Sequence, residues 1–526
     1  MAASGGITRR RFLGATAGAG LALVASGGVA RALTGPAFLR DRGAPLPGPP
    51  FTLGVASGDP LHDRVVLWTR LAPDLLAPDG GLGTAPVPVR WQVATDERFA
   101  KVTAEGRTTA RPEHAFSVHV DAKGLQPDRE YFYRFRAGDQ LSPVGRTRTA
   151  PADDAGLKHL RFAFSSCQNY QDGYFTAYKH MADEDVAFVA FLGDYIYENG
   201  VQPTAPRQHE GPEPMDLAAY RVRYGRYKSD LDLQAAHAAF PWIVTWDDHE
   251  VENNYANDRA DDDTLPPDRF LERRAAAYKA WWEHQPVRLD PPDGPDLRIY
   301  RELGFGRLAQ VNVLDTRQYR TNQPCNSPLD VGVACADTAA PTATLMGERQ
   351  ERWLRRSLQR SRARWRVVAQ QVMVGRVNFV PGGTDPVFNF DQWDGYGAAQ
   401  QRFVDTLDRA AHGNAVVITG DIHSSWVNDL NARPGDDASR TVATEFAGTS
   451  ITSSFDFAAV VAGSIAGNPA VKYYEGERRG YAVCDLTADE WRTDYRYVST
   501  VDSPDATIET AASFVVDHRK PGAQPA

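Results

Sequence analysis

The sequence predicts a mixed α/β protein in which a small all-β sandwich precedes a larger α/β domain. Two observations lead to this fold class. Up to about residue 150, short alternating or apolar runs are separated by Gly, Pro and Asp; beyond Pro151, continuous apolar runs alternate with longer mixed segments. The chain has 526 residues, 42% hydrophobic and 24% charged, which is enough apolar mass for more than one core.

Residues 1–32 have the pattern of a twin-arginine signal peptide. Arg9–Arg11 precede a weakly apolar run rich in Ala and Gly, which ends at an A-x-A motif at residues 30–32. We therefore expect export by the twin-arginine machinery to a periplasmic or secreted location. Because that route carries folded proteins, often with a metal or cofactor already inserted, it also hints at a bound metal.

The charge of the chain argues against a stable nucleic-acid partner. Cleavage after Ala32 would remove four arginines and no acidic residue, which lowers the net charge from −9 to −13. A surface that tracks a nucleic-acid backbone is basic, so such a partner is not expected. After signal removal no run supplies the roughly 20 apolar residues of a membrane span.

The first domain, residues 45–150, is predicted to be a fibronectin-like or Ig-like β-sandwich. Its strand-length runs are Val65–Trp68, Val89–Val93, Phe116–Val120 and Tyr131–Phe135. No cluster of ionisable residues stands out in this region. We therefore expect it to serve packing or positioning.

The second domain, residues 156–500, is predicted to be a layered α/β domain, because its apolar runs suit strands covered on both faces. The clearest runs are Leu160–Phe164, Val186–Leu192, Ile243–Trp246, Leu308–Leu314, Val367–Ala369 and Val416–Thr419. The helical candidates between them are Phe175–Asp183, Asp216–His237, Pro267–His284, Gly347–Ser361 and Ala398–Ala411.

The cysteines and the C-terminal tail allow further expectations. Cys325 and Cys335 lie ten residues apart in a loop rich in Pro, Asn, Asp and Gly, and are expected to form a disulfide in an exported protein. Cys484 is expected to be a buried free thiol. The tail, residues 501–526, contains an apolar piece at Ala511–Val516, which predicts either a helix closing over the site or a docking segment.

Five clusters of polar residues follow predicted strands. They are Ser165–Asn169, Gly193–Glu198, Asp247–Asn254, Asp315–Arg317 and Gly420–His423. A lone Asp after a strand is commonly a helix N-cap, and a lone His is commonly a hydrogen-bonded filler. Because open α/β sheets bind their ligands at the carboxyl ends of strands, five clusters at one predicted edge indicate a functional site.

The residue types in these clusters indicate metal ions, because so many charged groups in one pocket would be costly without neutralising cations. Oxygen donors suit Ca²⁺, Mg²⁺ or Mn²⁺, whereas a thiolate, a phenolate and an imidazole favour Fe³⁺. The oxygen donors are Asp247, Asp248, Asn254 and Asp421, and the second set is Cys167, Tyr197 and a histidine. We expect two unlike sites that share one carboxylate, with Asp194 as the best candidate.

Other catalytic schemes fit the sequence less well. A cysteine phosphatase needs a C-x₅-R motif, but the sixth residue after Cys167 is Gly173. Neither a G-x-S-x-G elbow nor a P-loop motif occurs, and His249–Asn253 is not H-E-x-x-H. Nucleophilic serine chemistry and P-loop chemistry are therefore not expected.

The motifs and their order resemble those of the PhoD family of secreted alkaline phosphatases and phosphodiesterases. The matching motifs are Phe164–Cys167, Gly193–Glu198, Trp246–Glu250, Leu314–Arg317 and Gly420–Trp426, and the segment Asp391–Tyr396 also resembles one of the family's. The resemblance runs from about Phe51 to Tyr497. It implies a four-layer αββα metallophosphoesterase domain behind the β-sandwich, and a centre of Fe³⁺ and Ca²⁺ similar to that of purple acid phosphatases.

The resemblance also implies the iron ligands. Asp194 and Tyr197 match a GDxxY motif, in which the Asp bridges the two metals and the Tyr binds iron. Cys167 stands where purple acid phosphatases use an aspartate, and His423 resembles the second histidine of their GHxH motif. Both are therefore expected on the iron.

The calcium ligands and the catalytic residues follow from the same resemblance. Asp248 and Asp421 replace nitrogen ligands by oxygen, which favours calcium; Asn254 is a further candidate and Asp247 a less certain one. His249 is expected to protonate the leaving alkoxide, oriented by Glu250 or a nearby carboxylate. Arg317 is expected either to clamp the phosphate or to form an ion pair with Asp315 or another neighbour.

The expected function is that of a secreted, monomeric alkaline phosphatase acting on small phosphate monoesters and diesters. Its reaction would be in-line attack at phosphorus by a metal-activated hydroxide or oxide, releasing phosphate. Two alternatives stay open at this point. One is a phosphodiesterase or phospholipase D-type enzyme acting on phospholipid or teichoic acid, and the other is a non-catalytic secreted binding protein.

Overall fold

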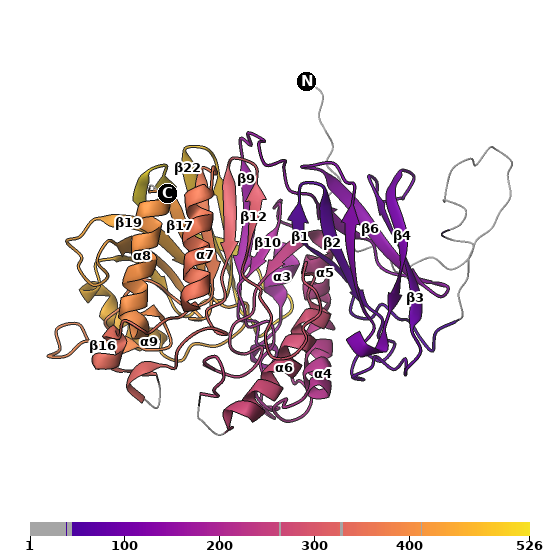
Figure 1. Ribbon diagram of the computed structural model, residues 1–526, viewed down its shortest axis with the longest axis horizontal. Coiled ribbons are helices and arrows are strands. Elements are labelled where there is room, and N and C mark those ends of the chain that lie inside the picture. The colour runs from indigo at the N-terminus through magenta and orange to yellow at the C-terminus, as the bar shows by residue number, and fades with distance from the viewer. Residues whose placement is uncertain (1–37, 39–44, 262–264, 327–329, 412) are drawn as a thin grey trace.

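The protein is a mixed α/β structure with several β-sheets. The computed structural model describes residue 38 and residues 45–261, 265–326, 330–411 and 413–526, so the predicted signal peptide lies outside the described residues. Figure 1 shows the helices around two large sheets, with a smaller β region at the right. None of the helices in the described ranges combines the length and apolar character needed to cross a membrane.

The larger sheet, as far as the chain is described, has ten strands in the order β24-β23-β22-β21-β9-β10-β11-β1-β2-β5. Its centre is parallel, because β10 pairs in parallel with both β9 and β11, and β11 does so with β1. The strands are β1 (Val55–Leu61), β2 (Arg64–Arg70), β5 (Ser117–Lys123), β9 (Leu160–Ser165), β10 (Val189–Phe191), β11 (Pro241–Val244), β21 (Gly480–Leu486), β22 (Glu490–Val498), β23 (Ile508–Asp517) and β24 (Lys520–Pro525).

The second sheet has seven strands within the described residues, in the order β12-β13-β15-β17-β19-β18-β20. Strands β13, β15, β17 and β19 are parallel neighbours. The strands are β12 (Arg301–Phe305), β13 (Ala309–Val313), β15 (Trp365–Gln370), β17 (Ala415–Thr419), β18 (Ser425–Asn431), β19 (Thr441–Ala447) and β20 (Val471–Glu475). A separate two-stranded antiparallel sheet pairs β14 (Val331–Val333) with β16 (Val387–Asn389).

The helices follow the sequence prediction with two exceptions, one of which is that α9 (Ala458–Ser464) was not predicted. The predicted helix Asp216–His237 is divided in two, because Asp230 has extended backbone angles and its side chain accepts hydrogen bonds from the next helix's backbone. The α-helices are α3 (Thr176–Met181), α4 (Leu217–Lys228), α5 (Leu231–Ala239), α6 (Pro267–His284), α7 (Gly347–Arg360), α8 (Gly397–Ala411) and α9 (Ala458–Ser464). The 3₁₀-helices are η1 (Pro112–His114), η2 (Tyr170–Asp172), η3 (Pro324–Asn326), η4 (Ala336–Ala339), η5 (Trp393–Tyr396) and η6 (Ile465–Gly467).

The two large sheets pack face to face over an apolar core, and helices cover their outer faces (Figure 1). In β15, Val367 and Ala369 join the core between the sheets, whereas Val368 packs with residues of α7 and α8. On the opposite side, aromatic residues such as Tyr224 of α4 and Trp281 of α6 pack on the ten-stranded sheet. Burial on both faces explains why the central strands are continuously apolar.

The N-terminal strands form two facing sheets, but one of these is not separate from the rest of the protein. One sheet contains β3 (Val87–Ala94), β4 (Val102–Ala110), β6 (Glu130–Ala137), β7 (Gln140–Leu141) and β8 (Gly145–Arg148). The strands that face it, β1, β2 and β5, belong to the ten-stranded sheet, because β1 pairs with β11. This pairing covers the edge of β11, which would otherwise be open.

The C-terminal tail forms strands, so the predicted closing helix is wrong. In β23, Phe514 and Val516 are buried while their immediate neighbours are more exposed, which is the alternation of a strand covered on one face. Both side chains join the core between the large sheets, and so does Ala523 of β24. The tail therefore extends the ten-stranded sheet instead of covering the site.

The cysteines lie as the sequence analysis expected. Cys325 and Cys335 form a disulfide with their Cα atoms 5.7 Å apart. Cys484 is a buried free thiol in β21, and Cys167 is likewise buried and free of a disulfide. Cys167 is thus available as a thiolate ligand.

Candidate active site

The five polar clusters predicted from the sequence meet where strands of both large sheets end. Cys167 follows β9, Asp194 follows β10, and Asp247–Asn254 follow β11, all in the ten-stranded sheet. Arg317 follows β13 and Asp421–His423 follow β17 in the seven-stranded sheet. The site therefore lies between the two sheets, at the carboxyl ends of their parallel strands.

Several site residues have a backbone conformation that is uncommon for residues other than glycine. Their φ angles are positive at Cys167 (57°), Asp194 (58°), Asn254 (51°), Asp421 (61°) and His423 (53°). Gly193 has a φ of 112°, and a Cβ atom there would lie 2.4 Å from the Cβ of Asp247. The strands thus turn sharply at their ends, and glycine permits the close approach of two of these turns.

A first group of possible metal ligands combines sulfur, oxygen and nitrogen donors. Ligand atoms of Cys167, Asp194 and His423 lie within 4.8 Å of one another. The Tyr197 hydroxyl donates to Asp194 Oδ2 at 3.0 Å, lies 2.9 Å from His423 Nε2, and accepts from Ser453 Oγ at 2.7 Å. The chain between Asp194 and Tyr197 therefore curls back to one centre, as predicted from their spacing.

Two further groups of ligand atoms adjoin the first. Among the described residues, Asp194, Asp248 and His249 form one, and Asp247, Asp248 and Asp421 form the other, each within 4.8 Å. Since Asp194 and Asp248 each belong to two groups, the three groups are contiguous. This arrangement can hold two cations that share Asp194.

Asn254 lies beside these groups with its side-chain amide directed elsewhere. Its backbone N–H donates to Asp248 Oδ2 at 2.7 Å, while its side-chain nitrogen donates to Asp330 at 2.8 Å. Its contact with the predicted ligands is therefore made through the backbone, which positions the Asp248 carboxylate.

Buried oxygen atoms without hydrogen-bond partners show that this pocket fits metal ions. In the described part of the chain, Asp194 Oδ1, Asp247 Oδ2 and Asp248 Oδ1 are buried and accept no hydrogen bond. Burial raises the pKa values of Asp194 and Asp247, and neighbouring carboxylates raise them further. Bound cations would favour the ionised forms of these carboxylates, so the donor set suits metal binding.

The pKa values of the thiol and the phenol in the first group are raised for the same reasons. Burial raises the pKa of Cys167 and of Tyr197, and the Asp194 carboxylate adds to both shifts. A thiolate and a phenolate at these positions therefore require a strongly polarising cation beside them.

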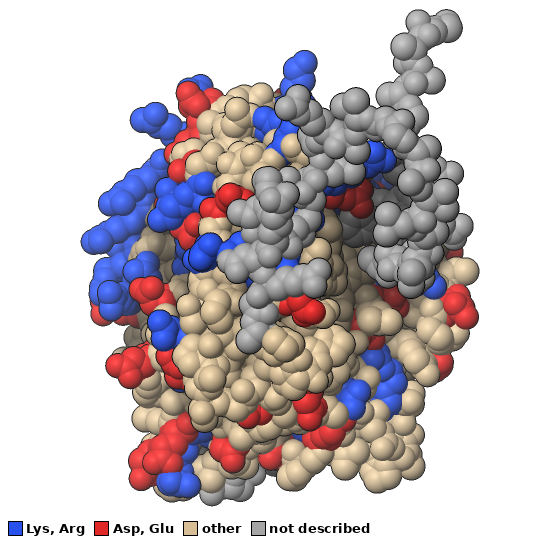
Figure 2. Space-filling model, turned by 90° about the vertical axis from the view of Figure 1, so that its right-hand side faces the viewer, with Lys and Arg blue, Asp and Glu red and all other residues tan. Residues whose placement is uncertain are grey.

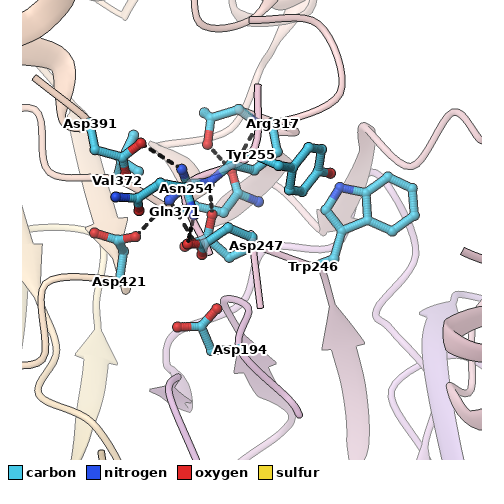
Figure 3. Close-up of polar contacts among 12 residues, drawn as sticks. Asp194, Trp246, Asp247, Asn254, Tyr255, Arg317, Gln371, Val372, Asp391 and Asp421 are labelled. Carbon is cyan, nitrogen blue, oxygen red and sulfur yellow. Dashed lines mark hydrogen bonds and ion pairs between the residues drawn. The ribbon is translucent and has the colours of Figure 1, made fainter. Parts of the chain in front are cut away.

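Arg317 lies inside the carboxylate cluster and does not face the opening of the site. Its guanidinium is fully buried and donates to Asp247 at 2.5 Å, Asp391 at 2.8 Å and Asp421 at 2.7 Å (Figure 3). An Asp248 oxygen lies 3.4 Å from the same guanidinium. The expected phosphate clamp does not match this geometry, whereas the alternative of an ion pair with a neighbour does.

His249 is oriented by Glu198. His249 Nδ1 lies 2.7 Å from Glu198 Oε2, and the imidazole stacks on the ring of Tyr197 with centroids 4.1 Å apart. Burial lowers the pKa of His249, but the carboxylates of Glu198, Asp248 and Asp194 more than offset this, so the pKa lies well above its ordinary value. The ring is held in place, and its second nitrogen is left for a reacting group.

Glu250, which the sequence analysis offered as a partner of His249, has a structural role instead. Its carboxylate accepts backbone hydrogen bonds from Asp194 at 3.0 Å, Tyr195 at 2.6 Å and Asp247 at 2.8 Å. Burial and the nearby Asp194 raise the pKa of Glu250 to about 8. Glu250 thereby ties together the turns that follow β10 and β11.

Solvent reaches the cluster on one side. The side chains of His423, Asp421 and His249 are 21%, 12% and 11% exposed, whereas those of Asp194 and Asp247 are only 2% and 1% exposed. A substrate would therefore approach past the two histidines and Asp421, while the other carboxylates stay behind them.

Sequence reasoning missed several residues of the site. Asp391 binds both Arg317 and Arg320, Gln392 donates to Asp421, and Ser453 donates to Tyr197. The family-like segment Asp391–Tyr396 carried a signal for the first two. Ser453 follows β19, and its position after a buried parallel strand was the available signal.

The fold and the site are those of an α/β enzyme whose clustered acidic residues, histidines and cysteine could hold metal ions. Residues 162–495 match the PhoD-like phosphatase family, and residues 39–151 match the N-terminal domain of PhoD-like phosphatases. The chain belongs to the PhoD-like phosphatase family.

Two relatives support this assignment. Alkaline phosphatase D from Bacillus subtilis (strain 168) is 45% identical over 528 residues, which cover 98% of this chain and 88% of that protein. A solved structure described as "Structure of PhoD" is 45% identical and has a TM-score of 0.87, covering 92% of this chain and 93% of that one. The resemblance inferred from the motifs is thus confirmed.

Proposed function

We propose that this chain is an alkaline phosphatase that hydrolyses phosphate monoesters and diesters at the site between the two large sheets. The observation that carries this proposal is the contiguity of three ligand groups through Asp194 and Asp248. Phosphate esters carry negative oxygens, and two cations at such a site would neutralise them as the ester bond breaks. The identity of the chain as a phosphoric ester hydrolase follows from its family.

The metal on one side of Asp194 is proposed to be Fe³⁺. Cys167, Tyr197 and His423 would hold it together with Asp194, because Fe³⁺ suits a phenolate and a thiolate. When bound, the two ions supply positive charge to the phosphoryl oxygens and lower the pKa of water at the centre.

The metal on the other side of Asp194 is proposed to be Ca²⁺. Asp248 and Asp421 would hold it, with Asp247 as a further ligand, because Ca²⁺ prefers oxygen donors. Asn254, the other candidate from the sequence, would position Asp248 through its backbone N–H. Arg317 would position these carboxylates through its ion pairs and so set the shape of the oxygen-rich side.

His249 is proposed to donate a proton to the departing alkoxide. It lies at the open side of the site, and the Glu198 carboxylate favours its protonated form. Glu198 is a positioning residue in this account, because it acts on the substrate only through the imidazole.

We also propose the finer features of fold and location. The two facing sheets with their outer helices would be the four-layer αββα metallophosphoesterase domain, residues 156–500, preceded by a sandwich domain at residues 45–150. The motif at residues 1–32 supports export by the twin-arginine machinery to the periplasm or the medium, and a disulfide suits that oxidising compartment. The exported protein would be a monomer.

Turnover of two substrates tests the proposal. The purified protein, supplied with iron and Ca²⁺, is assayed at alkaline pH with an aryl phosphate monoester and a bis-aryl phosphodiester. Turnover of the monoester is expected, and the kcat/KM ratio between the two substrates measures the preference. Turnover of the diester alone would favour the phosphodiesterase alternative, and turnover of neither would favour a binding protein.

Glu198→Gln is expected to shift the pH dependence of the reaction. The neutral amide no longer favours imidazolium, so the pKa of His249 falls, and His249 loses its proton at lower pH. The alkaline limb of kcat/KM for an alkyl phosphate should therefore move down by about one pH unit. Glu272→Gln, at an exposed position of α6, is the matched control. An alkaline limb at the same pH in both variants would contradict the role of Glu198.

Tyr197→Phe is expected to abolish the visible colour of the iron-loaded protein. A phenolate bound to Fe³⁺ absorbs visible light, whereas phenylalanine offers no ligand atom. Absorption spectra and metal analysis of the two proteins provide the measurement. Tyr473→Phe, which removes a hydroxyl that pairs with Tyr497, should keep the colour. A colourless wild-type protein that contains only zinc and is fully active would overturn the iron assignment.

A further inference from the structure

A groove lined mainly by arginine lies beside α7, apart from the residues of the active site. A cavity of about 760 Å³ is formed between α7 and the edge strand β12. Its basic lining residues are Arg298, Arg349, Arg352, Arg356, Arg360 and Arg362, and its acidic ones are Asp153 and Glu302. In Figure 2, basic side chains gather along the upper left edge of the view.

The groove continues around the end of α7. A second cavity of about 430 Å³ shares Arg362 and Ala363 with the first. It adds Arg307, Arg364, Arg366 and Arg519 to the lining, and no carboxylate is among the described residues that line it. The two cavities are therefore adjacent and both are lined mainly by basic side chains, on a chain whose net charge is −9.

The arginines of α7 form a row. Arg349, Arg352, Arg356 and Arg360 follow one another at intervals of three or four residues, which places them on one face of the helix. With a rise of 1.5 Å per residue, this row is about 16 Å long. Along the helix axis, successive arginines of this row are about 5–6 Å apart.

Most of these arginines are not neutralised by the protein. Arg352 pairs with Glu348 at 2.5 Å, and Glu302 accepts a hydrogen bond from Ser357. Within the described ranges, no carboxylate lies within 4.0 Å of the guanidinium groups of Arg349, Arg356 or Arg360, all three of which are exposed. These three exposed guanidinium groups are therefore free of protein carboxylates in the described ranges and can bind an anion from solution.

We propose that this groove binds a linear polyanion that carries a phosphate group on every unit. Guanidinium groups bind phosphate oxygens through paired hydrogen bonds, and a row of them matches a row of regularly spaced phosphates. The two cavities are concave and adjacent, so a flexible chain can enter them, whereas a flat lipid surface cannot.

The course of α7 relates this groove to the active site. At the start of α7, the Gln350 side chain exchanges hydrogen bonds with the backbone of Asp315, in the loop that carries Arg317. At its other end, Arg360 lies just before β15, where the strands begin. A chain bound along α7 would thus extend from the far end of the sheet toward the end that carries the ligand groups, and would hold the protein on the polyanion without entering the active site.

Binding of labelled inorganic polyphosphate tests the proposal on the intact protein. The triple variant Arg349→Gln, Arg356→Gln and Arg360→Gln is expected to bind about tenfold or more weakly. The slope of log K against log salt should fall by about 2 for three lost phosphate contacts. Turnover of a small phosphate monoester should stay unchanged, and an excess of that monoester should not displace the polymer.

A second triple variant controls for total charge. Arg355→Gln, Arg409→Gln and Arg433→Gln removes three exposed arginines outside both cavities, one of them on α7 itself, and should bind within about twofold of wild type. Equal weakening in both variants, or no weakening in the first, would overturn the proposal. Binding confined to anionic lipid vesicles would overturn it in favour of a membrane.

The single variant Arg356→Glu gives an independent comparison. If its affinity for polyphosphate equals that of the wild type, this result also counts against the groove.

Discussion

Asp194→Asn is expected to lower kcat/KM for a phosphate monoester by about a thousandfold or more, the largest effect of any single substitution in this protein. Asp194 takes part in two ligand groups, and its buried Oδ1 accepts no hydrogen bond within the described residues. The amide keeps the shape of the side chain but removes its negative charge, so both cations lose a shared ligand. Steady-state kinetics and metal analysis of the purified variant should show lost turnover together with lost metal.

Asp128→Asn is a control with a similar backbone conformation. Asp128 has a φ of 51°, close to the 58° of Asp194, but its side chain is exposed and pairs with Arg148. Its substitution should leave both turnover and metal content within about twofold of wild type. Full metal content with normal turnover in Asp194→Asn would refute the assignment of Asp194 as the shared ligand.

His249→Ala should discriminate between substrates by their leaving groups. An alkyl phosphate, whose alkoxide needs a proton, is expected to lose about 10²–10⁴-fold in kcat/KM, whereas an activated aryl ester should lose much less. The reason is that, in the proposed mechanism, the imidazole held by Glu198 at the open side of the site would protonate the leaving oxygen. The slope of log kcat/KM against leaving-group pKa provides the measurement.

The control for this prediction is His62→Ala, at an exposed position between β1 and β2. It should leave the slope unchanged. A steepened slope is specific to a lost proton donor, because a general loss of structure or metal would lower turnover of both ester types alike. Equal loss for both types in His249→Ala would therefore assign the residue to metal binding or folding.

The sequence predicted the elements whose pattern is local. Strands such as β15 are buried on both faces, so their apolar runs were visible without a structure. α6 begins and ends where its sequence predicted, at Pro267 and His284. The ligand clusters were visible for a similar reason, since each directly follows such a strand.

The features that the sequence did not reveal depend on contacts between distant parts of the chain. Arg317 could have faced the phosphate or a carboxylate, and only the convergence of the segments after β11, β16 and β17 places three aspartates around it. In the same way, Glu250 follows His249 directly whereas Glu198 lies 51 residues before it, and only the folded backbone brings Glu198 to the imidazole. The structure of the C-terminal tail, residues 501–526, could not be predicted, because an apolar run as short as Ala511–Val516 fits a strand as well as a helix.

The pairing of β9 with β21 has a consequence for how the protein is made. β9 carries Cys167 at its end, yet its antiparallel neighbour β21 is encoded about 300 residues later. At about 5–20 residues per second, the ribosome needs roughly 15–60 s to reach that segment. During this interval one side of β9 lacks its final neighbour, so the nascent chain needs protection from aggregation, and the centre can assemble only near the end of translation.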